Sequence, residues 1–190
     1  MLDETSMTPL ALFCRQVRNR SAENRTALEL LHHHRLTGTV VSILRLELDS
    51  MVRCIFLGSI TNGKYRAQLI EDSVHGRQWR TEDGKRKVTD RDMVEISNTF
   101  HGWTRNVYTF GCRFIHLSDF HDYADRDPFD SLTQEERQDI GAYLQHYHGL
   151  IVDANTKMRE ILWVLPRVFE KIAANLECCI RDLEAGSQIT

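Results

Sequence analysis

The residues with the greatest chemical potential lie close together in the segment 105–123. If this segment is helical, one stripe of its surface carries groups that titrate or form hydrogen bonds: Tyr108, Cys112, His116, Asp119 and Tyr123. His116, with Asp119 one turn later, has the composition of an oriented general base. The alternative is that His116 is a partly buried histidine whose ring bonds to a neighbouring helix. A second stripe, Phe110, Phe114 and Leu117, is predicted to face the core.

A second set of charged residues lies on the most apolar stretch of the chain, Val40 to Leu57. Arg45, Asp49 and Arg53 are spaced four residues apart, so a helix places them on one face as an Arg–Asp–Arg ladder. Charges on an otherwise apolar helix must be paired or must line a cavity. The favoured interpretation is an internal ladder of ion pairs to neighbouring helices. The alternative is an anion pocket, because guanidinium groups match the geometry of phosphate.

Histidine and acidic residues also raise the question of a metal site. The best set is His116, Asp119 and His121, which makes a metal-dependent hydrolase an alternative function. The consecutive histidines at 32–34 point in three directions on a helix and cannot share one ion. The chain has one Glu-x-x-His motif, whereas helical di-metal sites use two. We therefore expect no metal and no other cofactor.

The polar stretch from Gly76 to Val88 is predicted to be an exposed loop or hairpin. It places Trp79 among several basic residues, a combination that can contact single-stranded nucleic acid. A solvated charged loop is the favoured interpretation.

The elements that must position these residues are all predicted to be helices. Capping signals begin helices at Thr8-Pro9, at Thr89-Asp90 and at the capping box Thr133–Glu136. Pro166 must kink or split the last apolar pattern. The segment 104–123 is expected to be one continuous helix. No stretch alternates with period two, so we expect no sheet.

Together these elements predict an all-α, single-domain bundle of about seven or eight helices over residues 1–190. The apolar helix around Arg45 is placed at its centre. The helices over 133–186 are expected to complete the bundle.

Composition narrows the classes of function. A formal net charge of −3 argues against a strong, sequence-independent grip on nucleic acid. Four ionisable residues within the apolar stretch 40–57 argue against a membrane span. The five cysteines are odd in number and scattered, which is typical of reduced thiols in the cytoplasm. We therefore expect a cytoplasmic protein with no membrane partner.

Two segments resemble bacterial helical domains of the HEPN-like superfamily. The helix Ile43 to Arg53 resembles their "Leu-Arg, then acidic" helix. Tyr108, Cys112, the pair Ile115-His116 and Ser118 resemble a second hallmark, in which a Tyr, a small residue, an aliphatic-His pair and a Ser follow one another. The resemblance places a HEPN-like core over residues 8–123.

The resemblance implies a helical bundle that is often a homodimer. Many members are metal-independent ribonucleases of toxin and anti-phage systems, in which an Arg-x(4–6)-His motif holds the phosphate and moves a proton. This chain departs from that pattern, because its single match, Arg25 to His32, lies outside the hallmark segment. Family members without the motif act as binding or assembly modules.

We therefore expect a non-enzymatic helical module of a defence or stress system that binds a nucleotide, RNA or a partner protein. Its ligand would contact residues from the two hallmark helices: Arg45, Asp49, Tyr108, Arg113, His116 and Asp119. The first alternative is a metal-independent ribonuclease, with Arg113 on the phosphate and His116 transferring the proton. Both interpretations require the helices centred on Arg45 and His116 to face each other.

Overall fold

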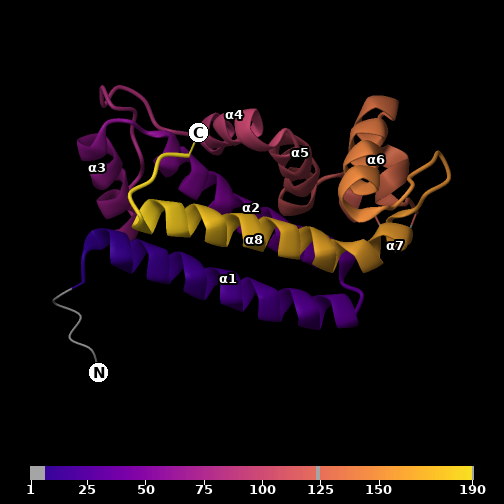
Figure 1. The fold of residues 1–190 in the computed structure, drawn as a ribbon. Helices are drawn as coiled ribbons and strands as arrows, with labels where there is room; N and C mark the ends of the chain where they lie inside the picture. The colour runs from indigo at the N-terminus through magenta and orange to yellow at the C-terminus, as the bar shows by residue number, and fades with distance from the viewer. Residues whose placement is uncertain (1–6, 123–124, 190) are drawn as a thin grey trace.

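The computed structural model describes residues 7–122 and 125–189 of the chain. Over these residues it contains seven α-helices of 12 residues or more and one short α-helix. Extended backbone pairs within this part of the chain only at a single bridge between Arg80 and Lys87, so the described residues contain no strand. The all-α class that the sequence predicts is confirmed, and Figure 1 shows the helices as a bundle.

In chain order the helices are α1 (Pro9–His33), α2 (Thr37–Ser59), α3 (Gly63–Val74), α4 (Asp90–His101), α5 (Thr104–Ile115), α6 (Gln134–His148), α7 (Met158–Ile161) and α8 (Leu165–Glu184). The connections between the helices range from a few residues to the long segments that follow α3, α5 and α6, and some contain 3₁₀ turns. The 3₁₀ turns are Asp119–His121, Pro128–Ser131 and Leu162–Val164.

Helix α2 is the centre of the bundle, as its apolar sequence predicts. It packs against α1, α3, α4, α5 and α8, and α8 in turn packs on α1. Figure 1 shows α1 and α8 running side by side along α2. Leu48, Met51 and Ile55 of α2 are completely buried. Burial on every side of α2 explains why its sequence has no broad polar face.

The predicted capping residues begin the helices as expected. The Thr8 hydroxyl accepts a hydrogen bond from the Ala11 amide, and Thr89 and Thr133 each form a capping box with the residue three positions later. Pro166 lies in the first turn of α8, where a missing amide hydrogen costs nothing. The last apolar pattern is accordingly split into α7, a 3₁₀ turn and α8.

The prediction of one continuous helix over 104–123 is wrong. Helix α5 ends at Ile115, and His116 has extended backbone with φ −94° and ψ 139°. The Ser118 hydroxyl donates to the Arg113 carbonyl oxygen at 2.8 Å and so competes with continuation of the helix. The chain then turns to bury Phe120, while Leu117, predicted for the core, is 93% exposed. Tyr123 lies outside the described residues.

The segment from Gly76 to Val88 is largely exposed, as predicted, with Trp79 as its one buried residue. Trp79 is only 4% exposed and stacks on Phe56, with 5.9 Å between the ring centroids. Its face is therefore not free to stack on a base, which corrects the idea of a single-stranded nucleic-acid contact at this residue. The basic residues around it, including Arg80, Lys85 and Arg86, are exposed.

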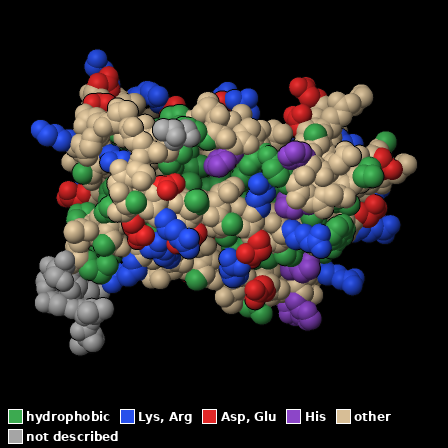
Figure 2. Space-filling view, in the orientation of Figure 1, with side chains coloured by type: hydrophobic (Ala, Val, Ile, Leu, Met, Phe, Trp, Pro, Cys, Tyr) green, Lys and Arg blue, Asp and Glu red, His purple; other side chains and the backbone are tan. Residues whose placement is uncertain are grey.

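The surface visible in Figure 2 carries both signs of charge, and the cysteines form no disulfide. None of the helices in the described ranges is long and apolar enough to cross a bilayer. Figure 2 shows Lys and Arg side chains interspersed with Asp and Glu over the visible face. All five cysteines are free, and Cys14, Cys54 and Cys179 are part of the core.

Candidate functional site

The structure brings together three of the predicted ligand-binding residues, Arg45, Asp49 and Tyr108. The Arg45 guanidinium carbon lies 4.0 Å from the centroid of the Tyr108 ring. Arg45 Nη1 lies 3.9 Å from Asp49 Oδ1, and Arg45 Nη2 lies 3.4 Å from Asp90 Oδ2 of α4. The Arg45 side chain is only 6% exposed and Asp49 14%, whereas Asp90 is 45% exposed, so the ion pairs run from the interior to the surface.

Asp49 is shared by two further arginines. Its carboxylate lies 3.1 Å from Arg53 Nε and 3.4 Å from Arg20 Nη1 of α1. Gly111 of α5 lies directly against Arg45, since a Cβ at this glycine would be 2.8 Å from Arg45 Cβ. The space around Arg45 is thus filled by protein atoms, which supports the internal ion-pair ladder over a ligand pocket at this residue.

The other predicted residues lie elsewhere. Arg113 pairs with Glu136 of α6, and its guanidinium carbon lies 4.7 Å from the centroid of the Phe120 ring. His116 and Asp119 follow the end of α5 and are exposed. Among the described residues, neither side chain has a hydrogen-bond or ion-pair partner. The hallmark helices α2 and α5 do face each other at Arg45 and Gly111, but His116 lies beyond that contact.

The residues considered for a metal site are not gathered into one. The described part of the chain contains no group of three His, Cys, Asp or Glu side chains placed to hold an ion. His116, Asp119 and His121 are therefore not arranged as ligands of a common metal. The His121 ring nitrogen Nδ1 instead accepts a hydrogen bond from the Ser118 amide at 3.4 Å.

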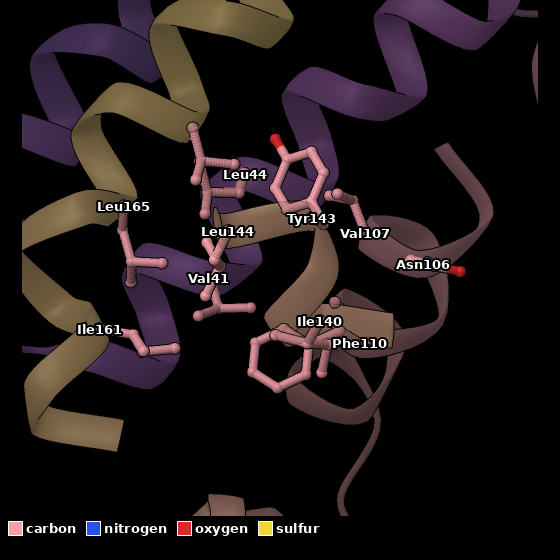
Figure 3. Close-up of a pocket in the computed structure, with 12 residues that line it drawn as sticks. Val41, Leu44, Asn106, Val107, Phe110, Ile140, Tyr143, Leu144, Ile161 and Leu165 are labelled. Atoms are coloured by element: carbon pink, nitrogen blue, oxygen red, sulfur yellow. The ribbon is translucent and has the colours of Figure 1, made fainter. Parts of the chain in front are cut away.

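A cleft between α5 and α6 has the features of a binding site. One part of it is an apolar cavity of about 40 Å³. Figure 3 shows its wall, built from Val41 and Leu44 of α2, Val107 and Phe110 of α5, Ile140 and Tyr143 of α6, and Ile161 and Leu165 on the opposite side. The wall consists almost entirely of hydrocarbon, which favours an apolar group over water.

The second part of this cleft carries charged residues. It is a hollow of about 150 Å³ that shares Asn106, Phe110 and Ile140 with the apolar cavity, so the two adjoin. Its charged lining consists of Arg105, Arg113, Glu136 and Asp139. Small-molecule sites typically combine an apolar interior with a few converging polar groups. The α5–α6 cleft, meaning these two adjoining parts, has that combination.

A basic and aromatic cluster lies behind the cleft. The Tyr143 ring lines the cavity, and its hydroxyl oxygen lies 3.3 Å from His148 Nε2. Lys171 Nζ of α8 lies 4.0 Å from the Tyr147 ring centroid and 5.4 Å from that of Trp103. Burial lowers the pKa of Lys171 and raises that of Tyr143. Among the described residues, the Lys171 ammonium group contacts aromatic faces and pairs with no carboxylate.

Two histidines beside this cluster make the stability of the fold depend on pH. Burial lowers the pKa of His101 and of His148, and the charge of Lys171 lowers both pKa values further, with Arg167 adding to the effect at His148. Below the ordinary histidine pKa of 6.5, the unfolded chain therefore binds more protons than the folded chain. The free energy of unfolding is expected to fall as the pH drops from about 6.5 through the lowered values.

Lys171→Met is expected to raise the pKa of both histidines and to make this loss of stability smaller. NMR titration of the imidazole C–H signals measures the pKa values, and urea unfolding at about pH 7.5 and about pH 5.5 measures the stability. Lys64→Met, a change at an exposed residue of α3, is the matched control. Unshifted pKa values of His101 and His148 in Lys171→Met would contradict the proximity of Lys171 to these two histidines.

Sequence reasoning missed most of the cleft. Glu136 is recognised from its capping box, and its Oε2 does accept from the Thr133 amide, but its Oε1 also pairs with Arg113. No sequence signal indicates this second partner. The cavity wall is made of Val, Leu, Ile and Phe, which are ordinary core residues in a helical pattern. Only the packing of α5, α6 and α8 shows that a space is left between them.

Comparisons with known proteins do not add a family. No family model, curated protein or solved structure matches the chain.

Proposed function

We propose that the chain is a non-enzymatic binding module and that the α5–α6 cleft is its binding site. The observation that carries the proposal is the direct contact between an apolar cavity and a charged hollow. A suitable ligand would bury a short aliphatic group in the apolar cavity and pair a polar end with the charged residues of the hollow.

The charges of the hollow favour a zwitterionic ligand. Arg113 pairs with Glu136 and Arg105 with Glu95, and each guanidinium retains further N–H donors for a carboxylate. Asp139 and the remaining lone pairs of Glu136 offer acceptors to an ammonium group. Asp139 has no ion-pair partner among the described residues and is thus available. A phosphate group here would meet two carboxylates at close range. The proposed ligand class is accordingly a small aliphatic amino acid or a compound with the same groups, rather than the nucleotide or RNA that the sequence suggested.

Calorimetric titration with four probes tests this proposal. L-Leucine carries both charges and the aliphatic group, 4-methylpentanoate and isoamylamine each lack one charge, and glycine lacks the aliphatic group. L-Leucine is expected to bind most tightly. Each single-charge probe is expected to bind about tenfold more weakly, equivalent to about 1.4 kcal/mol. Glycine is expected not to bind.

Val107→Phe supplies the matching change in the protein. The larger side chain is expected to fill the cavity and abolish binding of L-leucine. Ile151→Phe, at a residue that is 73% exposed, is the control and is expected to bind as the natural chain does. Binding that survives Val107→Phe, or no response to any of the probes by the folded protein, would refute the assignment of this cleft.

The ribonuclease alternative finds no supporting geometry. The exposed His116 side chain has no partner within the described ranges that would orient it as a proton-transfer group. Ribonuclease activity, the homodimer and the HEPN-like family stay predictions.

A further inference from the structure

We propose that a hollow at the other end of the molecule binds the phosphate group of a small molecule. This arginine hollow has a volume of about 300 Å³ and lies between α1, α2, α3 and the segment that follows α3. The residues that carry the argument are Arg20, Arg53, Arg77, Ser50, Ser73 and Trp79. Figure 1 shows α3 at one end of α8 and α6 at the other, so the hollow is separate from the α5–α6 cleft.

The lining of the arginine hollow carries positive charge only. Arg20 comes from α1, Arg53 from α2 and Arg77 from the segment after α3, and the lining includes no Asp or Glu. Ser50 and Ser73 add hydroxyl groups. Three guanidinium groups from three elements around one space match the charge and the hydrogen-bond geometry of a phosphate.

Carboxylates outside the lining hold these arginines in place. Asp49 lies 3.4 Å from Arg20 Nη1 and 3.1 Å from Arg53 Nε, and Asp90 lies 3.3 Å from Arg53 Nη2. Asp72 lies 2.7 Å from Arg77 Nε, and Glu71 lies 3.5 Å from Arg77 Nη2. Each guanidinium has five N–H donors, and these contacts leave most of them free. The carboxylates thus fix the orientation of the arginines, which retain N–H donors for an anion.

A buried donor without an acceptor is a second, independent indication. Trp79 is 4% exposed and lines the arginine hollow, and its indole Nε1 has no hydrogen-bond partner among the described residues. A buried N–H group without a partner costs about 1–3 kcal/mol, so native proteins rarely leave one. Because Trp79 borders the arginine hollow, we attribute the missing acceptor to an anion bound there. Arg53 already lies over this ring, with its guanidinium carbon 5.3 Å from the centroid.

The surroundings indicate which part of a ligand is recognised. The aromatic residues of the lining, Phe13 and Trp79, are both 4% exposed, so neither offers a free face for a nucleobase. The hollow is therefore suited to the phosphate and not to an attached base. A phosphate monoester such as a sugar phosphate and inorganic phosphate itself share this chemistry.

Calorimetric titration with ribose 5-phosphate, inorganic phosphate and ribose tests the proposal. The two phosphates are expected to bind and ribose is not. Tighter binding of ribose 5-phosphate would identify an ester as the source of the phosphate, and equal affinities would identify the free anion. Binding of ribose as tight as that of ribose 5-phosphate, or no binding of either phosphate, would overturn the proposal.

Arginine variants locate the binding to this hollow. Arg20→Gln and Arg77→Gln alter side chains that are 41% and 48% exposed, so both variants are expected to fold. Each is expected to weaken phosphate binding about tenfold. Arg181→Gln on α8, where the side chain is 74% exposed and lies outside the lining, is the matched control. Unchanged affinity in both hollow variants would show that phosphate binds elsewhere.

Discussion

Asp49→Asn is expected to lower the free energy of unfolding by about 3 kcal/mol. The substitution removes the charge that Arg45, Arg53 and Arg20 share. Arg53 and Arg20 are partly exposed and can turn to water, but the Arg45 side chain is 6% exposed and keeps only Asp90. Breaking a buried ion pair costs about 3–5 kcal/mol because one charge is left uncompensated, and the remaining carboxylate places the expected loss at the lower end. Urea unfolding measures the difference.

A double substitution distinguishes the loss of one partner of the Arg45–Asp49 pair from the replacement of both charges by apolar side chains. In Arg45→Met with Asp49→Leu, both buried charges give way to apolar side chains, and most of the lost stability is expected to return. Arg45 Nε has no acceptor among the described residues, so methionine also removes an unsatisfied donor. Glu95→Gln, which breaks the exposed pair with Arg105, is the control and is expected to cost less than about 1 kcal/mol. An Asp49→Asn variant as stable as the natural chain would argue against a structural ladder.

The ladder illustrates what the sequence predicts well. Spacings of three and four residues depend only on helix geometry, so the shared face of Arg45, Asp49 and Arg53 follows from the sequence. Threonine caps and the position of Pro166 are equally local, and all of them are found where expected. The same rules explain why the central helix is recognised from its composition.

The candidate sites depend on contacts that are distant in the sequence. Glu136 reaches Arg113 across 23 positions, and Arg20 and Arg77 meet at one hollow although they lie on different elements. A single sequence does not indicate which helices become neighbours, so neither the cleft nor the arginine hollow was predicted. The anion-binding role suggested for Arg45 instead moves, in our proposal, to Arg53 on the same ladder.

The end of α5 shows how tertiary packing overrides a helical pattern. Period 3.6 places Leu117 on the core stripe with Phe110 and Phe114. The structure instead buries Phe120, whose ring centroid lies 5.3 Å from that of Phe114 and 6.1 Å from that of Phe110. An aromatic side chain buries more apolar surface than leucine, so ending the helix early is favourable.

Phe120→Ala is consequently expected to destabilise the fold by about 3–5 kcal/mol, through lost apolar burial and the cavity that remains. Leu117→Ala, three positions earlier and at a residue that is 93% exposed, is expected to change stability by less than about 0.5 kcal/mol. Urea unfolding of the two variants distinguishes the two arrangements, because a helix continued through this segment would bury Leu117. The opposite order of effects would therefore contradict the observed end of α5. Since Phe110 packs on Phe120 and lines both parts of the α5–α6 cleft, Phe120→Ala is also expected to weaken ligand binding there.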